Sequence, residues 1–403
     1  MIEIMTTHSS SHVCDITVVG TGLVGLACAL GLAQQGWRVA LLGHRPNPSH
    51  ESVDWDSRVY AFSPATQALL TQLKVWTQLP PERIQPVHEM RVFNGANSTP
   101  SSALYFTAYE ACVSQLAWIA ENRSVAQVLS TGCAYHSNIQ WFETQAQQWE
   151  QHASGIAITL DDNHVVRSAL VVGADGKDSW VRKQAGLTIT KHDYEQRGIV
   201  AHFRSSKPHG GTAWQWFRDD GILALLPLPD CSVSMVWSAN LPQAEHILQL
   251  TPQALAEHVS QASNFVLGDL ITTMPALGFT LSLQDTNSLM AERVALVGDA
   301  AHVIHPLAGQ GMNLGMADVA ALLNILAERE SHRAFDDIRL LQRYARQRAI
   351  PIAAMRGMTH GLQQLFATQN PAAYWLRKVG MQALGQPLFA SIKKKLIQQA
   401  LQA

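Results

Sequence analysis

A chain of 403 residues that is 47% hydrophobic can bury a large core, and its length predicts two or three domains. The formal net charge is −2, with no run of Lys and Arg interleaved with aromatic residues, so composition argues against nucleic-acid binding. Five widely spaced cysteines without a CxxC pair indicate buried thiols in a reducing compartment. Neither a secretory signal nor an apolar run of about 18 residues is found. We therefore expect a cytoplasmic protein whose membrane contact, if any, is peripheral to the inner membrane.

The first predicted elements form a βαβ unit. Ile16 to Val19 is a mainly β-branched strand, Leu23 to Gln35 has the composition of a buried helix, and Trp37 to Leu42 is a second buried strand. Two later apolar runs, Ala169 to Val172 and Arg293 to Val297, each lead into a glycine and an aspartate. We predict that these dispersed strands belong to the same nucleotide-binding domain.

Residues 187–285 have a different character. Trp214 and Trp216, together with Leu223 to Leu228 and Ser232 to Trp237, predict antiparallel strands joined by Gly, Pro and Asp turns. This segment is expected to form a substrate domain inserted into the first domain. The two tryptophans share one strand face, so they are either core residues or candidates to line a pocket for an aromatic ring.

A GxGxxG sequence lies between the first strand and the first helix. In a dinucleotide site, such glycines allow a tight turn and a close approach of the backbone to a pyrophosphate, which faces the helix N-terminus. An ordinary glycine turn is the alternative interpretation. The candidate cofactor-binding residues here are Gly20, Gly22, Leu23, Val24 and Gly25.

Position 43 departs from this fingerprint. An acidic residue is expected there, at the end of the second strand, to bind ribose hydroxyls, but the chain has Gly43. We expect either that other groups hold the ribose or that dinucleotide binding is weakened. In the second case, Gly43→Glu would tighten binding.

Two further motifs make a family resemblance definite. One is Gly173-Ala174-Asp175-Gly176 continuing to Arg182, and the other runs from Gly298-Asp299-Ala300-Ala301-His302 through the HPLAGQGMNLG sequence to Asp318. With GxGxxG, their order and spacing resemble the class A FAD-dependent aromatic monooxygenases, and the nearest subgroup is that of the ubiquinone-biosynthesis hydroxylases. The resemblance covers about residues 15 to 350.

The resemblance implies an α/β chain, α+β overall. It has a Rossmann-like FAD-binding domain, an inserted mainly antiparallel β-sheet substrate domain and C-terminal helices. The expected limits are 1–75, 105–186 and 286–340 for the FAD-binding domain, 76–104 and 187–285 for the substrate domain, and 341–403 for the helical region.

The resemblance also implies roles for single residues around FAD. Asp299 would accept hydrogen bonds from the ribityl hydroxyls, and the turn after it would bring backbone amides and a helix N-terminus beside the flavin ring. Arg58 and Asp175 would lie around the flavin and its nicotinamide reductant. The candidate residues of the turn and helix are Pro306, Gly309, Gln310, Gly311, Met312 and Asn313.

His302 and His305 are three residues apart, which raises the question of a metal site. No Cys or carboxylate set of suitable spacing accompanies them, and Pro306 indicates a loop rather than a helix face. We therefore predict no metal site.

The function implied by the resemblance is hydroxylation of the ring of a polyprenylated phenol or quinone precursor in ubiquinone biosynthesis, with FAD, NADH or NADPH, and O₂. No catalytic base is singled out. The alternatives are a hydroxylase of another soluble aromatic compound and a non-catalytic lipid-binding subunit of the ubiquinone-biosynthesis assembly. Residues 331–403 hold 11 Lys and Arg against two acids, so a contact of the basic C-terminus with anionic lipid or a partner protein is weighed against a solvated helix.

Overall fold

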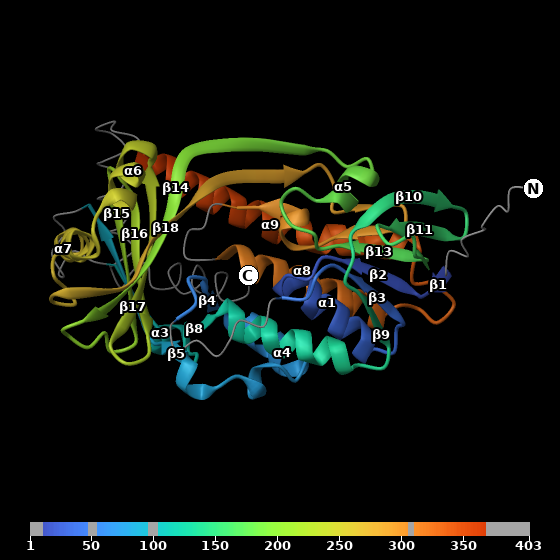
Figure 1. Ribbon diagram of the computed structural model, residues 1–403, viewed down its shortest axis with the longest axis horizontal. Helices are drawn as coiled ribbons and strands as arrows, with labels where there is room; N and C mark the ends of the chain where they lie inside the picture. Colours follow the sequence, from blue (N-terminus) through green and yellow to red (C-terminus); the bar gives the residue numbers. More distant parts are fainter. Residues whose placement is uncertain (1–10, 47–54, 96–103, 305–309, 368–403) are drawn as a thin grey trace, which may run out of the picture.

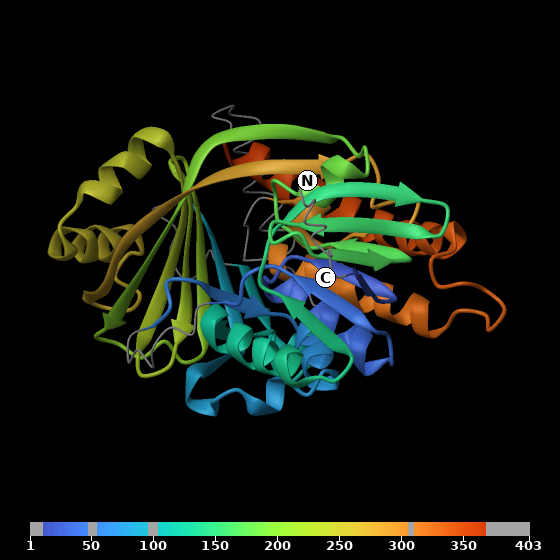
Figure 2. The same cartoon turned by 45° about the vertical axis from the view of Figure 1, so that its right-hand side comes forward.

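The computed structural model describes residues 11–46, 55–95, 104–304 and 310–367. Within these ranges the strands form four sheets, and the two largest lie at opposite ends of the molecule (Figure 1). Two long strands, β14 (Ile189–Ser205) and β18 (Leu270–Thr286), extend from one end toward the other (Figures 1 and 2).

A six-stranded sheet contains the predicted βαβ unit. Its order is β19-β20-β13-β2-β3-β9, with parallel pairing from β20 to β9 and an antiparallel edge strand β19. Strands β2, β3 and β13 are buried along their whole length, as expected for a parallel sheet covered on both faces. The strands are β2 (Ile16–Val19), β3 (Val39–Leu42), β9 (Ile139–Phe142), β13 (Leu170–Gly173), β19 (Met290–Ala291) and β20 (Val294–Leu296).

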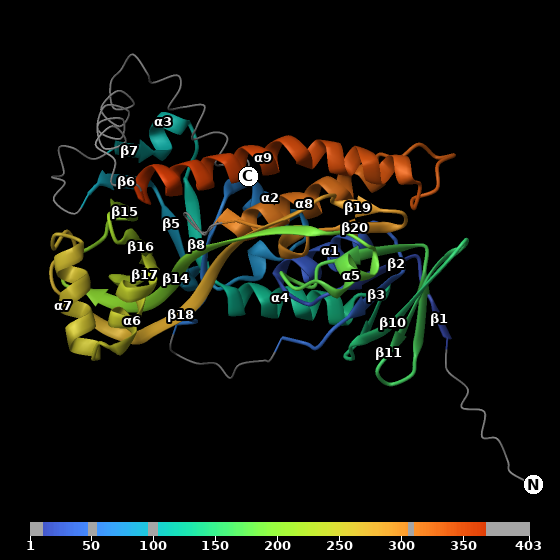
Figure 3. The same ribbon diagram turned by 90° about the horizontal axis from the view of Figure 1, so that it is seen from above.

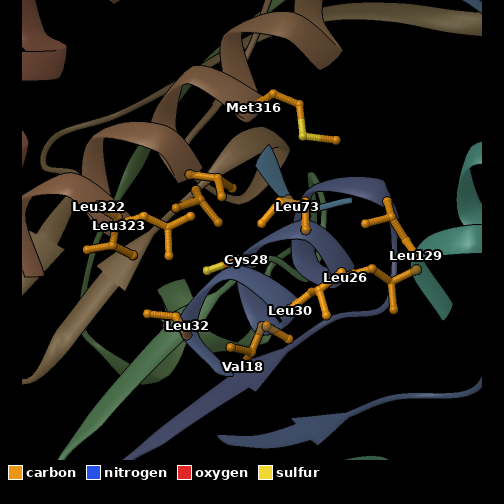
Figure 4. Close-up of a cluster of buried hydrophobic side chains, with 14 of the residues drawn as sticks. Val18, Leu26, Cys28, Leu30, Leu32, Leu73, Leu129, Met316, Leu322 and Leu323 are labelled. Carbon is orange, nitrogen blue, oxygen red and sulfur yellow. The ribbon is translucent and has the colours of Figure 1, made fainter. Parts of the chain in front are cut away.

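Helices cover one face of this sheet. Helix α1 (Leu23–Gln34) packs against α4 (Asn122–Tyr135) and α8 (Gln310–Ala327). Figure 4 shows Leu26 and Leu30 of α1 beside Leu129 of α4, with Leu323 of α8 nearby; all four are buried. Burial of one such side chain contributes about 1.5–3 kcal/mol, so this cluster anchors the start of α1 firmly to the sheet.

The opposite face is covered by a four-stranded sheet that the sequence did not reveal. Its order is β1-β12-β11-β10, and Ile156, Ile158 and Val166 pack onto Leu42 and Val171 of the six-stranded sheet. The strands are β1 (Ser11–Val13), β10 (Ala146–His152), β11 (Gly155–Leu160) and β12 (Val165–Ser168).

The eight-stranded sheet at the other end has the order β21-β18-β14-β17-β16-β15-β6-β7. Helices α6 (Leu241–Gln249) and α7 (Pro252–Ala262) cover its outer face (Figures 1 and 2). The antiparallel strands predicted between 187 and 285 are confirmed, while the division of the chain into domains stays a prediction. The remaining strands are β6 (Glu89–Asn94), β7 (Leu104–Thr107), β15 (Thr212–Arg218), β16 (Gly221–Leu228), β17 (Ser232–Asn240) and β21 (His302–Val303).

Two elements join the halves. A three-stranded sheet, β4-β8-β5, leads into α2 (Pro64–Gln72), and the long helix α9 (Ile338–Ala367) runs along the molecule from β19 toward β6 and β7 (Figure 3). None of the helices in the described ranges has both the length and the apolarity to cross a bilayer. The strands of the small sheet are β4 (Val59–Phe62), β5 (Ile84–Val87) and β8 (Ala117–Glu121).

Candidate functional site

A cavity of about 910 Å³ lies between the six-stranded and eight-stranded sheets. One side is formed by the glycine-rich turn, the segment before β4, the segment around Asp299 and the start of α8. The other side is the inner face of the eight-stranded sheet. The predicted site residues that line this cavity are Gly22, Leu23, Val24, Arg58, Asp299, Gly311 and Met312.

The glycines of GxGxxG have two different roles. Gly20 has a φ of +113°, and a Cβ there would lie 2.2 Å from the carbonyl oxygen of Ala174. A Cβ on Gly25 would lie 2.1 Å from the carbonyl oxygen of Gly20, so these two glycines allow the turn to close against β13. Gly22 has open space beside it and lines the cavity. No side chain caps the start of α1 at Leu23, which leaves the free N–H groups of the first turn available to an anionic ligand.

Asp299 lies in a short 3-10 helix, Gly298–Ala300, directly after β20. Its accessible surface faces the cavity, yet the protein surrounds it. This burial raises the pKa of the carboxyl, against the opposing charges of His302 and Lys177. Among the described residues none donates a hydrogen bond to this carboxylate. The carboxylate is nevertheless accessible from the cavity, so a ligand with several hydroxyl groups, such as the ribityl chain of a flavin, would find a free acceptor there.

Arg58 reaches the cavity from a loop that is held by Asp56 and the buried Glu121. Asp56 accepts a hydrogen bond from the backbone N–H of Arg58 at 3.0 Å, and Glu121 accepts one from the N–H of Asp56 at 2.6 Å. Glu121 is fully buried and paired with Arg83 at 2.6 Å and Arg123 at 3.0 Å. Burial alone would raise the pKa of Glu121, but these hydrogen bonds and charges hold it below its usual range. Glu121 was not among the site residues predicted from the sequence.

Asp175 does not line the cavity. Its Oδ2 accepts a hydrogen bond from the N–H of Val181 at 3.0 Å, and its Oδ1 is buried without a partner among the described residues. Arg182 ties the same segment to the Asp299 region by donating to the carbonyl oxygens of Ala300 and Lys177, both at 2.8 Å. Asp175 therefore holds the turn in place, and Lys177 is the charged residue of the same turn that lines the cavity.

The residues at the start of α8 also have different surroundings, some in the cavity and some away from it. Gly311 and Met312 line the cavity, whereas Asn313 is buried and faces β4 and α2. Asn313 donates to the carbonyl oxygen of Ala61 at 2.7 Å and accepts from Thr66 Oγ1 at 2.9 Å, so it fixes the position of the helix start. Pro306 and Gly309 lie outside the described residues, as does the side chain of Gln310.

His302 belongs to a buried ion-pair network. Its Nε2 lies 2.6 Å from Oδ2 of Asp318, and Nε of Arg348 donates to Oδ1 of the same carboxylate at 2.7 Å. Asp318 also accepts a hydrogen bond from the N–H of Gly298 at 3.0 Å. These contacts connect α8, α9 and the Asp299 segment. Within the described part of the chain no group of three or more His, Cys, Asp and Glu side chains is arranged to hold a metal ion, and His305 lies outside that part.

The backbone at Gly43 bears on the expectation for this position. Its φ of +134° is a backbone conformation that L-residues rarely adopt, and a Cβ would lie 3.0 Å from Cγ2 of Thr21. A glutamate at this position would be strained rather than poised to bind a ribose. The strained backbone therefore argues against tighter binding by Gly43→Glu, and the effect on binding stays a prediction.

The inner face of the eight-stranded sheet was not recognised in the sequence. Trp214 and Trp216 point to the outer face, where they form a core with α6 and α7. Of the two interpretations the core one is therefore correct, and neither tryptophan lines the cavity. Gln215, between them, lines the cavity instead. Strand alternation was visible in the sequence, but it does not tell which face meets the helices. The cavity-lining residues from β14 to β18 include Val200, Gln215, Ile222, Ala224, Leu226, Ser234, Val236, Ser238, Leu277 and Phe279.

Comparison with known proteins matches residues 13–356 to the family described as FAD binding domain. The chain is 31% identical over 376 residues to 3-demethoxyubiquinol 3-hydroxylase of Escherichia coli (strain K12). This match covers 92% of this chain and 94% of that protein. It is 31% identical over 380 residues to ubiquinone hydroxylase UbiL of Rhodospirillum rubrum, covering 94% and 87%. The solved structure of p-nitrophenol 4-monooxygenase PnpA from Pseudomonas putida DLL-E4 matches with a TM-score of 0.75 at 17% identity, covering 98% of this chain and 99% of that one. The mixed α/β fold expected from the sequence is thereby confirmed.

Proposed function

The chain belongs to the FAD binding domain family of flavoprotein monooxygenases, and from this premise we propose that it hydroxylates the aromatic ring of a polyprenylated phenol or quinone precursor in ubiquinone biosynthesis. The observation that carries this proposal is the cavity itself. On one side of it lie the glycine-rich turn and the segment around Asp299, and on the other side lies a largely apolar sheet face. The two relatives named above are, by name, hydroxylases of 3-demethoxyubiquinol and of ubiquinone.

FAD, reduced by NADH or NADPH, supplies the transfer of one oxygen atom from O₂. The chain would hold it with the N–H groups at the start of α1 near Gly22 to Val24, the carboxylate of Asp299 and the backbone at Gly311 and Met312. Arg58 brings a positive charge to the same cavity, where it would stabilise negative charge on the cofactor or substrate.

The sheet wall would position the substrate ring and keep water away from it. Val200, Ala224, Leu226 and Val236 present apolar surface to the cavity and leave room for a flat ring. An apolar wall also suits a ring that carries a prenyl tail.

The alternative of another, soluble aromatic substrate is kept because apolar walls bind many aromatic compounds. The non-catalytic alternative is set aside because the family is one of enzymes. We further propose peripheral contact with the inner membrane or with a ubiquinone-biosynthesis complex, through a basic C-terminus that lies mostly outside the described residues.

The test uses the purified FAD-loaded protein with NADH or NADPH in air. We expect it to hydroxylate a phenol with a short prenyl tail, detected by mass spectrometry as the gain of one oxygen. Cells that lack the protein should accumulate a polyprenyl phenol that is missing one ring oxygen. Turnover of tail-less phenols alone, without accumulation in cells, would support the soluble-substrate alternative.

A further inference from the structure

The inner face of the eight-stranded sheet has a regular grid of residues. Gln215 on β15 pairs with Ala224 on β16, and Ala224 pairs with Val236 on β17. Val236 pairs with Val200 on β14, and Val200 pairs with Leu277 on β18. Directly opposed residues in antiparallel strands share one face, so these five side chains form a row across the wall of the cavity.

Gln215 is chemically unlike the rest of this row. It is 4% exposed and lines the cavity, between Ala224 on one neighbouring strand and Val92 on the other. Its amide makes no hydrogen bond with any residue that the structure describes. A buried amide without a partner is unfavourable in an empty protein and is normally satisfied by water or by a ligand.

The other polar residues of the wall are smaller. Ser234 pairs with Leu226 and Ser238 with Ile222, in the rows on either side of Gln215. The hydroxyl of Ser234 also lines the cavity and is buried without a described partner, but it stands on a much shorter side chain. The amide of Gln215 therefore has the larger reach into the cavity.

The shape of the wall restricts how a ring can lie. Ala224 and Val236 are short side chains in the middle of the row, so a flat ring can rest on them. At the row that contains Ser238, the ring of Phe279 lies on Gly198, where a Cβ would be 2.3 Å from the Phe279 Cζ atom. Phe279 thus limits the space beyond the middle of the wall, and a ring resting on Ala224 has its edge next to Gln215.

We propose that Gln215 is the residue that recognises oxygen substituents on the substrate ring. This proposal rests on the proposed function and specifies its substrate class. The Oε1 atom accepts a hydrogen bond from a ring hydroxyl, and the Nε2–H group donates one to an alkoxy or carbonyl oxygen on the adjacent ring carbon. The residue therefore selects rings with two neighbouring oxygen substituents over rings with one.

The test compares binding of two probes to the FAD-loaded protein, followed by the change in flavin absorbance. The probes are 2-methoxy-6-geranylphenol and 2-ethyl-6-geranylphenol, which differ by an oxygen atom in place of a methylene group. We expect wild type to bind the methoxy compound about tenfold more tightly, the scale of a hydrogen bond to a buried polar group. In Gln215→Leu the two compounds should bind equally.

Control variants separate this role from a general disturbance. Gln140→Leu makes the same change at an exposed position on β9 and should keep the wild-type preference. Gln215→Met keeps about the length of the side chain but offers no N–H or O–H donor, so it should also lose the preference for the methoxy compound. Unchanged flavin content and melting temperature show that each variant is folded, and if Gln215→Leu fails this check, the preference is judged from Gln215→Met.

The same measurement with tail-less 2-methoxyphenol and 2-ethylphenol distinguishes the two proposals. If only the tail-less pair binds and shows the preference, Gln215 has the proposed role and the prenylated substrate is wrong. If wild type prefers neither methoxy compound, or the preference survives in both Gln215 variants, the role of Gln215 is overturned.

Discussion

At the residue scale, Asp299 combines a fixed position with a carboxylate that faces the cavity and accepts no hydrogen bond from the described residues. The segment that carries it is fixed from two sides, by Asp318 at Gly298 and by Arg182 at Ala300. Because these contacts fix the backbone, a ligand that donates a hydrogen bond to the carboxylate meets a preorganised acceptor.

The first prediction is that Asp299→Ala lowers the FAD content of the purified protein. A hydrogen bond to a charged group contributes about 1.5–3 kcal/mol, so FAD binding should weaken at least about tenfold. Flavin absorbance per mole of protein after desalting measures the effect, and Asp162→Ala, in an exposed turn, is the control. Full flavin occupancy of Asp299→Ala at sub-micromolar free FAD would contradict the role of this carboxylate.

The second prediction concerns Gly43. Because its φ is +134° and Thr21 is close, Gly43→Glu should destabilise the fold by about 1–3 kcal/mol and should not tighten FAD binding. Thermal unfolding and FAD titration measure the two effects. Gly36→Ala is a matched control, because Gly36 also has a positive φ, +93°, but nothing near a Cβ. Tighter FAD binding by Gly43→Glu would show that the backbone can adapt.

At the element scale, the ion-pair network around Asp318 joins three elements that are distant in sequence. Asp318 lies on α8, Arg348 on α9, and His302 is in β21. All three side chains are buried, with Asp318 fully enclosed. The carboxylate also holds the N–H of Gly298, so the network connects the long C-terminal helix to the segment that carries Asp299.

The third prediction is that Arg348→Met destabilises the protein by about 3–5 kcal/mol, because it leaves a buried carboxylate with one of its charge partners missing. Arg346→Met changes an exposed residue of the same helix and should alter stability by no more than about 0.5 kcal/mol. Urea unfolding measures both. Equal stability of the two variants would mean that α8 and α9 are held together by their apolar contacts alone.

The fourth prediction is a pH dependence of stability. Burial would raise the pKa of Asp318, but the charges and hydrogen bonds of His302 and Arg348 hold it below its usual range. The stabilisation by this carboxylate is therefore present above the unfolded-state pKa of about 3.9 and is lost as the pH falls through the lower folded-state value. The stability difference between wild type and Asp318→Asn should be constant near neutral pH and shrink below about pH 4. A difference that stays constant down to pH 3 would contradict this.

At the scale of the whole molecule, the cavity lies between the six-stranded and the eight-stranded sheet. The strands β14 and β18 span the distance between them, while the three-stranded sheet and α9 connect the halves (Figures 1 and 3). The residues predicted to hold FAD lie on one side of this cavity, and the apolar face of the eight-stranded sheet lies on the other. A cofactor and a flat substrate can therefore bind side by side.

The fifth prediction concerns the charge distribution of the whole chain. Residues 331–403 carry a formal balance of +9 in a chain of −2 overall, and Lys393, Lys394 and Lys395 lie beside apolar residues. Each basic residue near an anionic membrane contributes on the order of 1 kcal/mol. Changing the three lysines to Glu should reduce co-sedimentation with vesicles that contain phosphatidylglycerol and leave the FAD content intact. Equal sedimentation of both proteins at low salt would reject membrane attachment through this segment.

The sequence by itself determined the features that depend on neighbouring residues. The βαβ unit, the glycine turn and the Asp299 segment were predictable because strand and helix periodicity and the need for small residues in tight turns are local properties. These features led to the FAD family and to part of one wall of the cavity.

Only the tertiary structure decided the features that depend on distant contacts. Whether Trp216 or its neighbour Gln215 faces the cavity follows from which sheet face packs on α6 and α7, and either face satisfies strand alternation. The pairing of Asp318 with Arg348 joins residues on two helices, and the backbone at Gly43 is set by its strand end and Thr21. In each case the decisive energy comes from packing or charge pairing between segments that are brought together only when the chain folds.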